Sequence, residues 1–374
     1  MNINHATLKK NTMTSRERVL AALAHKPTDR VPFSLLAGVN EPVKVELMRD
    51  LGFESLEQVD DYLLSFSDFR WVWPKYVGPS WRCHTDDRGA YVDQWGVKRA
   101  PAYYRPDAFY MEICEYPLAD MKAVEDLDRH VWPSVDWYDF SGVPDAIDRI
   151  YEDGEYAIMT GIGNIFERSW YMRGLELMLT DLLLDPELAD AIMTRVMNFY
   201  IDYFTAMLEA ANANGRNRPI DIVYTADDIG GQNGLMFSLD LWEKALKPKH
   251  KRLNDALHKY GVKIMYHSDG AIMDALGGLA EIGVDILEAL QFESKGMSPE
   301  IMKRQFGDML CFHGGISVQS TLPYGTPDDV KNEIVERIKV LGRDGGYILA
   351  PSHAIQAGTP VENVKALLAY KSYT

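Results

Sequence analysis

Two groups of metal-capable residues stand out in this sequence, and each follows an apolar run. The run from Val262 to Tyr266 is followed by His267 and, two residues later, by Asp269. Side chains at positions i and i+2 of a strand share a face, so these two can converge on one point. A second run, Tyr347 to Pro351, is followed closely by His353. Histidine nitrogens and carboxylate oxygens are ordinary zinc ligands, so the sequence predicts one zinc site where the two strand ends meet.

Further polar residues lie at or just beyond the ends of other apolar runs. They are Asn164, Arg168, Asp227, Asp228, Glu288, Gln291 and His313. In a parallel barrel the carboxyl ends of the strands form the rim at which active sites are built. The alignment of these residues with predicted strand ends therefore indicates a catalyst.

Several of these residues have a structural alternative. Asp269 could cap a helix that begins near Ala271, and His353 could bond a neighbouring carbonyl. Asp227 and Asp228 could bind substrate or fix the loop that follows them. His313 is typical of a buried structural histidine, although the two glycines after it allow a ligand to approach. Glu288 could be a metal ligand, a partner of a ligand or a rim carboxylate, and the metal-ligand interpretation is preferred.

Composition favours a compact intracellular enzyme. The 374 residues include 47% hydrophobic residues, enough to fill the core of one large barrel. A formal net charge of -16 opposes binding to nucleic acid or to anionic membranes. The three cysteines form no CxxC pair, which indicates packed thiols in a reducing cytoplasm. Residues 1–13 are predicted to be a flexible tail, and no stretch is apolar enough to span a membrane.

The elements that position these residues alternate between strand and helix, which predicts parallel βαβ units and a (β/α)8 TIM barrel over residues 14–374. The predicted strands are 31–36, 156–161, 220–225, 262–266, 286–290, 310–312 and 347–350. The predicted helices are 14–25, 42–51, 175–211 with a break at 185–186, 241–260, 271–281, 299–306, 327–341 and 360–370.

Residues 66–116 have a different texture from the rest of the chain. They carry Trp71, Trp73, Trp81, Trp95 and many tyrosines, interrupted by proline and glycine. This pattern predicts short antiparallel strands or ordered loops, inserted over one end of the barrel as a partial lid. The alternative is a satellite core in which the rings only bury surface.

The same residues carry a resemblance to a known family. From about Ser15 almost to the C-terminus, the sequence resembles the uroporphyrinogen decarboxylase superfamily, and more closely its branch of corrinoid-dependent methyltransferases. The matching segments are 16–23, 29–32, 227–232, 247–248, 267–270, 283–287, 312–316, 345–353 and 360–363. The resemblance implies a barrel fold and methyl transfer to or from a cobalt corrinoid.

Two departures from the superfamily pattern separate its branches. True decarboxylases carry an arginine-rich motif after the first strand, but residues 31–39 contain no arginine, which argues against porphyrinogen decarboxylation. Thiol-methylating members hold zinc through a His-x-Cys pair and a later cysteine. Here His267 matches the histidine, while Asp269 and His353 stand at the cysteine positions. Replacing two thiolates by a carboxylate and an imidazole leaves more positive charge on the metal, which suits polarising an oxygen.

The leading hypothesis is therefore a zinc-dependent methyltransferase that demethylates methoxylated, aromatic compounds and passes the methyl group to cob(I)alamin. A separate corrinoid protein would deliver the cobalamin, because this chain lacks an Asp-x-His-x-x-Gly motif. Methyl transfer from a methylcorrinoid to a thiol is the first alternative. A decarboxylase of the same superfamily and a non-catalytic zinc- or tetrapyrrole-binding module are the others, and a homodimer is left open.

Roles for the remaining residues follow from this hypothesis. Asp228 or His313 would orient the substrate or supply a proton, and Glu288 would be the further metal ligand. The predicted substrate-binding residues are Asn164, Arg168, Asp227, Gln232 and Gln291.

Overall fold

The computed structural model describes residues 12–106, 108–213, 215 and 218–373. Its central element is a seven-stranded parallel sheet, with strand order β1-β8-β9-β12-β13-β14-β15. These strands are β1 (Phe69–Trp71), β8 (Ala157–Asn164), β9 (Ile222–Ala226), β12 (Lys263–His267), β13 (Ile286–Ala289), β14 (Cys311–Ile316) and β15 (Tyr347–Pro351). The alternation predicted from the sequence is thus confirmed as an α/β fold around a parallel sheet.

One face of this sheet is strongly curved. Alternate residues of the strands point to this face and pack together in a separate apolar cluster, which includes Phe69, Met159, Ile222, Met265 and Ile348. The ring of Phe69 on β1 lies 6.2 Å from the ring of His313 on β14, although the two strands lie far apart in the sheet order. The two ends of the sheet therefore approach each other across this face.

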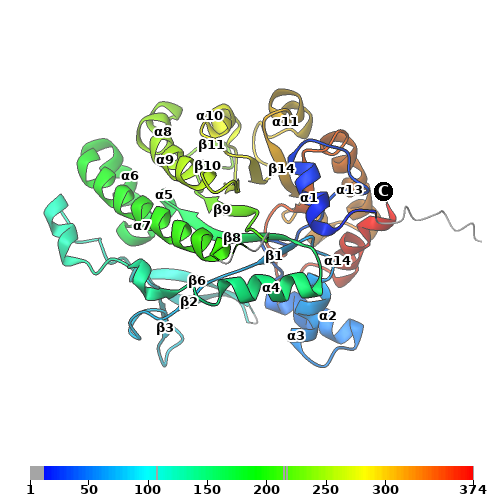
Figure 1. Ribbon diagram of the computed structural model, residues 1–374, viewed down its shortest axis with the longest axis horizontal. Coiled ribbons are helices and arrows are strands. Elements are labelled where there is room, and N and C mark those ends of the chain that lie inside the picture. The colour runs from blue at the N-terminus through cyan, green and yellow to red at the C-terminus, as the bar shows by residue number, and fades with distance from the viewer. Residues whose placement is uncertain (1–11, 107, 214, 216–217, 374) are drawn as a thin grey trace, which may run out of the picture.

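Helices cover the outer face of the sheet and bury the larger core cluster (Figure 1). Three helices precede the first strand of the sheet, namely α1 (Ser15–Leu23), α2 (Glu41–Leu51) and α3 (Leu56–Leu64). The helices after β1 are α4 (Val143–Asp153), α5 (Phe166–Arg173), α6 (Leu175–Leu184), α7 (Pro186–Asn212), α8 (Leu239–Ala245), α9 (Lys247–His258), α10 (Leu276–Glu281), α11 (Pro299–Phe306), α12 (Thr321–Tyr324), α13 (Pro327–Leu341) and α14 (Val361–Leu368). The predicted helix 241–260 is two helices, because Pro248 removes a backbone donor at their junction.

The predicted strand 31–36 is wrong as a strand. Only Phe33 forms a bridge, with Leu349 on β15. The carboxylate of Asp68 accepts a hydrogen bond from the backbone N–H of Phe33 at 2.8 Å, so a side chain takes the donor that a neighbouring strand would use. The carbonyl of Phe33 in turn accepts from the backbone N–H of Asp68 at 2.9 Å. Phe33 therefore contacts both edges of the sheet without a regular strand around it.

The N-terminal segment is linked by buried charge to Asp68, just before β1, and by ring stacking to the C-terminal segment. Arg18 is buried and donates to Asp29 at 2.6 Å and to Asp68 at 2.8 Å. Arg30 also donates to Asp68 at 2.8 Å. The ring of Phe33 stacks on that of Tyr370 at 4.6 Å between centroids.

The aromatic segment 66–116 divides between three sheets. β1 belongs to the parallel sheet, whereas a separate four-stranded antiparallel sheet contains β3 (His84–Thr85), β4 (Tyr91–Val92), β5 (Lys98–Arg105) and β6 (Ala108–Glu115). The short strands β2 (Lys75–Tyr76) and β7 (Tyr138–Asp139) pair with each other. In Figure 1 the strands labelled β2, β3 and β6 lie on the opposite side of the molecule from α8, α10 and α11. The predicted short antiparallel strands are confirmed, and the role of a lid stays a prediction.

The hairpin formed by β5 and β6 contacts two parts of the chain that are far apart in the sequence. Near its base, Arg99 and Arg168 on α5 share the carboxylate of Asp93, at 3.1 and 2.8 Å. Near its tip, the hydroxyl of Tyr110 donates to the side chain of Gln356, in the loop after β15, at 2.7 Å. The hairpin therefore connects the β8 side of the fold with the β15 side.

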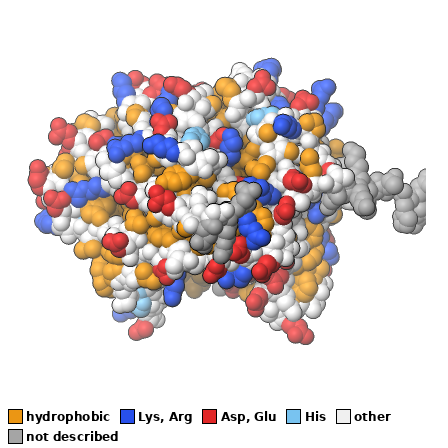
Figure 2. Space-filling model, viewed as in Figure 1, with side chains coloured by type: hydrophobic (Ala, Val, Ile, Leu, Met, Phe, Trp, Pro, Cys, Tyr) orange, Lys and Arg blue, Asp and Glu red, His pale blue; other side chains and the backbone are white. Residues whose placement is uncertain are grey.

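Acidic and basic side chains are interspersed over the face shown in Figure 2, with apolar side chains exposed between them. Within the described ranges, no helix is long and apolar enough to cross a membrane. The predicted flexible tail, 1–13, lies outside the described residues except for Thr12 and Met13, whose backbone N–H groups both donate to Asp29.

Candidate metal centre

The ends of β12 and β15 bring His267, Asp269 and His353 together. One ligand atom from each side chain lies within 4.8 Å of the others. The Nε2 atom of His267 is 3.9 Å from Oδ1 of Asp269, and the Nε2 atom of His353 is 3.9 Å from Oδ2 of Asp269. The side chain of His353 is 41% exposed and that of His267 is 13% exposed, so the group opens to solvent on the His353 side.

The ring of His267 is oriented by Glu288, its neighbour in the register of β12 and β13. The Nδ1 atom of His267 contacts Oε2 of Glu288, which also accepts a hydrogen bond from the hydroxyl of Tyr224 at 2.9 Å. Because an ionised carboxylate only accepts, the proton of the neutral imidazole belongs on Nδ1. The Nε2 atom then faces Asp269 and His353, and because the pKa of His267 is raised, a metal ion would displace a proton from Nε2 as it binds.

The buried pair also shifts the protonation of both partners. Burial disfavours the charged imidazole, but the nearby Glu288 carboxylate outweighs this effect and raises the pKa of His267 well above its ordinary value. Burial likewise works against the charge on Glu288, yet His267 holds the pKa of this carboxyl below its usual range. Glu288 is therefore an anion at neutral pH and an acceptor for the Nδ1 proton.

Asp269 is held by two neighbours. The side-chain amide of Gln291 donates to Oδ1 of Asp269 at 2.7 Å, and its oxygen accepts from the backbone N–H of Gly270 at 3.0 Å. The Oδ1 atom of Asp228 accepts from the backbone N–H of Asp269 at 2.8 Å and lies 3.5 Å from Nε2 of His267. Asp228 thus adds a second carboxylate to the group.

The loop after Asp269 needs glycine for close packing. Gly270 has a φ of +85°, and a Cβ atom there would lie 2.7 Å from the backbone of Gly230. A Cβ atom on Gly230 would lie 2.6 Å from the carbonyl oxygen of Asp269. The strand pair β10 (Gly230–Gly231) and β11 (Gly234–Leu235) can therefore press against this loop and fix the position of Asp269.

The three side chains fit a zinc ion by type and by separation. Zinc binds histidine nitrogen and carboxylate oxygen at about 2.0–2.2 Å in a tetrahedral arrangement, which places ligand atoms about 3.4 Å apart. The observed separations are 3.9 Å from each histidine to a different oxygen of Asp269, and the three ligand atoms lie within 4.8 Å of one another, so the side chains must move closer together to reach the zinc geometry. The prediction that these two strand ends converge agrees with the structure, and the identity of the metal stays a prediction.

Glu288 does not lie on the metal-binding side of His267, so its predicted place as a further ligand is not supported. Its Oε2 atom faces Nδ1 of His267, and its Oε1 atom is 4.0 Å from Nδ1 of His313. The side chain is 1% exposed at the bottom of the site. The geometry gives Glu288 the role of a partner that orients the predicted ligand His267, one of the alternatives open at the sequence level.

The predicted role of Asp227 in substrate binding stays a prediction, and the structure gives this residue protein partners instead. Its carboxylate is fully buried and accepts hydrogen bonds from the backbone N–H groups of Ile165, Phe166 and Glu167, at 3.2, 2.9 and 2.6 Å. It also contacts Nε2 of His250 at 2.5 Å. Asp227 therefore satisfies the free donors at the start of α5, a structural role at a helix N-terminus.

Asn164 and Arg168 also have protein partners. Asn164 accepts from the hydroxyl of Tyr200 at 2.9 Å and donates to Glu167 at 3.2 Å. The guanidinium of Arg168 binds Asp93 and lies over the rings of Trp95 and Tyr171. Both residues hold α5 against neighbouring elements. The structure does not bring them to the group of His267, Asp269 and His353, which we call the metal group.

The other two predicted substrate-binding residues have different positions. Gln291 uses both ends of its amide to hold the loop of Asp269, so its role here is positioning. Gln232 is exposed, and its backbone carbonyl accepts from the N–H of Lys295 at 2.9 Å. Neither residue is shown in contact with a substrate, and both assignments stay predictions.

His313 lies deep on the curved face, in the register position next to Glu288. Its side chain is 1% exposed, and both ring nitrogens lack a hydrogen-bond partner within the described residues. Burial lowers the pKa of His313 to about 4, so the ring is neutral at physiological pH. His313 is therefore a neutral imidazole behind the metal group, and a proton-donating role stays a prediction.

Sequence reasoning missed Tyr224 and Glu167. Tyr224 projects from β9 on the same face as His267 and binds Glu288. Its position two residues before the end of an apolar run was the available signal. Glu167 is buried and accepts from Tyr171, and burial together with the charge of Asp228 raises its pKa. No local pattern marks Glu167, because its environment comes from α5 packing against the end of β9.

Comparison with known proteins agrees with the predicted resemblance. Methylcobamide:CoM methyltransferase MtaA from Methanosarcina barkeri is 29% identical to this chain over 169 residues, and the same protein from strain Fusaro matches equally. That match covers 45% of this chain and 44% of the relative, less than half the length of either.

A solved structure and a family model extend the comparison. A methyltransferase from Methanosarcina mazei shares the fold, with a TM-score of 0.66 at 20% identity, over 96% of this chain and 98% of that one. The family model described as uroporphyrinogen decarboxylase (URO-D) matches residues 112–371, more than half of the chain. This chain therefore belongs to the URO-D family.

Proposed function

We propose that this protein is a zinc-dependent methyltransferase that moves a methyl group from a methoxylated aromatic compound to the cob(I)alamin of a separate corrinoid protein. The observation that carries the proposal is the convergence of His267, Asp269 and His353, with Nε2 of His267 turned toward the other two by the contact of Nδ1 with Glu288. The relative named methylcobamide:CoM methyltransferase supports corrinoid chemistry and a methylcorrinoid protein as partner.

In the proposed reaction, cob(I)alamin attacks the methyl carbon of the ether. The bond between methyl carbon and oxygen breaks, its electron pair stays on the oxygen, and methylcob(III)alamin and a phenolate result. A zinc ion with one carboxylate and two imidazole ligands would act as a Lewis acid toward the developing negative charge. Phenols have a pKa of about 10, so a phenolate with that assistance is a competent leaving group.

The protein's own residues prepare this step. Glu288 keeps the proton of His267 on Nδ1, and Gln291 and Asp228 hold the side chain and backbone of Asp269. The second carboxylate oxygen of Asp228 has no hydrogen bond within the described residues, and its side chain is 35% exposed. Asp228 is therefore the group best placed to orient the substrate or to carry a proton to the leaving oxygen.

Methyl transfer from a methylcorrinoid to a thiol is the second candidate. It is favoured by the name of the relative, which includes the thiol coenzyme M. The ligand set argues for the ether, because two thiolate ligands would leave a bound thiolate more nucleophilic than one carboxylate and two imidazoles do.

An anaerobic assay separates these candidates. The purified protein is mixed with cob(I)alamin and a series of methoxyarenes, and formation of methylcob(III)alamin is followed by its visible absorption. Turnover with an ether supports the proposal, whereas consumption of methylcob(III)alamin with a thiol as acceptor supports the alternative. Absence of both reactions, in protein that contains one zinc ion per chain, would leave a binding module.

We further propose that residues 14–374 work as one (β/α)8 barrel. The support is the position of Phe33, which bridges to Leu349 on β15 and exchanges hydrogen bonds with Asp68 just before β1. This segment would take the place of the eighth strand.

A further inference from the structure

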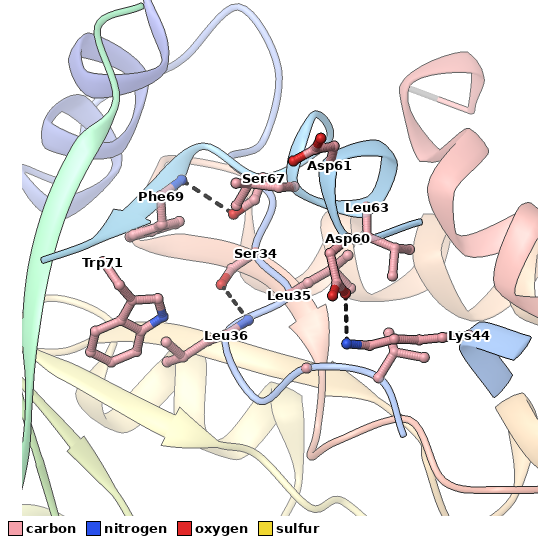
Figure 3. A pocket seen from close by; sticks show the side chains of 13 residues that line it. Ser34, Leu35, Leu36, Lys44, Asp60, Asp61, Leu63, Ser67, Phe69 and Trp71 are labelled. Atoms are coloured by element: carbon pink, nitrogen blue, oxygen red, sulfur yellow. Dashed lines mark hydrogen bonds and ion pairs between the residues drawn. The ribbon is translucent and has the colours of Figure 1, made fainter. Parts of the chain in front are cut away.

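A cavity of about 240 Å³ lies beside the parallel sheet, between the segment 34–39, helix α3 and strand β1 (Figure 3). Trp71 and Phe69 line it from β1, where their i and i+2 spacing turns both rings toward the curved face of the sheet. Leu36 lines it from the segment after Phe33, and Leu63 and Leu64 line it from α3. The cavity is therefore bounded largely by apolar side chains.

The polar groups of this cavity offer hydroxyl donors and no free cation. The hydroxyl oxygen of Ser34 accepts from the N–H of Leu36 at 3.1 Å, and that of Ser67 accepts from the N–H of Phe69 at 3.2 Å. Within the described part of the chain, neither hydroxyl donates a hydrogen bond, so both can donate to a ligand oxygen.

The charged residues of the lining argue against an anionic ligand. Lys44 is the one basic residue among those that line the cavity, and its ammonium is paired with Asp60 at 2.6 Å. Asp61 adds a second carboxylate to the lining. A carboxylate ligand would meet two acidic groups and a cation that is already paired, so it would lose solvation without a compensating partner.

The cavity is joined to the metal group by aromatic contacts. Trp71 packs edge to face on Tyr224 with ring centroids 6.0 Å apart, and the Tyr224 ring lies 6.2 Å from that of His267. Tyr224 also binds Glu288, the partner of His267. Trp71 therefore forms one wall of the cavity and also contacts Tyr224, which lies beside the predicted metal ligand His267.

We propose that this cavity binds the ring of a neutral aromatic ether, and that the hydroxyls of Ser34 and Ser67 donate to its oxygen substituents. A dry cavity of roughly 150 Å³ is sufficient to bind benzene, so the volume here accommodates one ring with small substituents. The assignment rests on the proposed function for the choice of an ether, and it adds the place of binding and the exclusion of aromatic carboxylates.

The test is binding, measured apart from turnover. The full-length protein as purified, with no corrinoid added, is titrated with 1,2-dimethoxybenzene and with 3,4-dimethoxybenzoate by isothermal calorimetry. The neutral ether should bind at least about 10-fold more tightly than the benzoate. Equal or tighter binding of the benzoate, or no binding of the ether, would overturn the proposal.

Two variants locate the site. Leu36→Trp fills the cavity from the segment after Phe33, and Leu64→Trp fills it from the more exposed edge of α3, where folding is least at risk. Leu184→Trp is the matched control, because Leu184 is 81% exposed on α6 and does not line the cavity. At least one folded cavity variant should weaken ether binding about 10-fold or more, and the control should not.

The outcomes separate this inference from the proposed function. If the protein binds the ether, if both cavity variants weaken that binding and if no methyl transfer occurs, the binding site is supported and the methyltransferase function is refuted. If both folded cavity variants demethylate the ether with unchanged KM and unchanged binding, the methyltransferase function is supported and the cavity is refuted as the binding site.

Discussion

The Nδ1 nitrogen of His267 is bound to the Oε2 atom of Glu288, and this contact selects which nitrogen of the ring can bind a metal. Partners of this kind typically change metal affinity 10- to 100-fold when they are replaced. Glu288→Gln keeps the size of the side chain but removes its charge. We expect its zinc affinity, measured by competition with a chelator, to fall at least about 10-fold. Glu281→Gln, at an exposed carboxylate on α10, is the control, and equal affinity in both variants would contradict the assigned role.

The three predicted ligands should be needed for methyl transfer and not for folding. Asp269→Ala and His353→Ala should each lower the rate of methylcob(III)alamin formation by at least about 100-fold, because several kcal/mol of charge stabilisation are lost. His84→Ala, at an exposed histidine of the small antiparallel sheet, should retain the rate. Elemental analysis should give one zinc per chain for the wild type. Near-normal demethylation by both folded variants would refute the site.

Asp227 should behave as a structural residue although it is adjacent to Asp228. Asp227→Ala leaves three backbone donors and His250 without their buried acceptor, so we expect a loss of about 3–5 kcal/mol in the free energy of unfolding. Urea denaturation measures this loss, with the exposed Asp240→Ala as control. Well below the unfolding transition, KM should be unchanged, and a raised KM at full stability would restore a role in substrate binding.

His130 should make the protein less stable in mild acid. Burial, together with the positive charges of Arg82 and Arg195, lowers its pKa to about 4, although Asp93 acts in the opposite direction. An unfolded histidine has a pKa of about 6.5, so the unfolded state binds a proton first as the pH falls. The contribution of the neutral His130 to the free energy of unfolding is therefore present above pH 6.5 and is lost progressively between about pH 6.5 and 4.

The variant His130→Phe isolates this effect. Over that pH range, its stability should fall by about 1–2 kcal/mol less than that of the wild type, after allowance for solvent screening. Urea unfolding at a series of pH values measures the difference, with His84→Phe as control. Parallel stability curves for His130→Phe and the wild type would rule the effect out.

The sequence predicted the parts of the site that depend on local spacing. His267 and Asp269 are two residues apart on one strand end, so their convergence follows from strand geometry. The place of Glu288 behind His267 depends on the register between β12 and β13, which a single sequence does not reveal. Asp227 and Asp228 are identical in type, and only the packing of α5 against the end of β9 separates the buried cap from the exposed carboxylate.

The difference between local and long-range determinants also explains which helices and strands were predicted correctly. Helices 299–306 and 327–341 were predicted with their observed limits, because serine or threonine caps and proline at the first turn mark their starts. The segment 31–36 has the composition of a strand, but Asp68, 35 residues later, takes the backbone donor of Phe33. Competition from a distant side chain leaves no mark in the local sequence.

The union of the two chain ends at Phe33 has a consequence for biosynthesis. Phe33 needs Leu349 for its bridge and Tyr370 for its stacking partner, and Arg30 binds the hydroxyl of Tyr370. During synthesis Arg30 and Phe33 are therefore made more than 300 residues before the partners that cover them. Contacts so distant in sequence form slowly, so the apolar surface around Phe33 is covered late in folding.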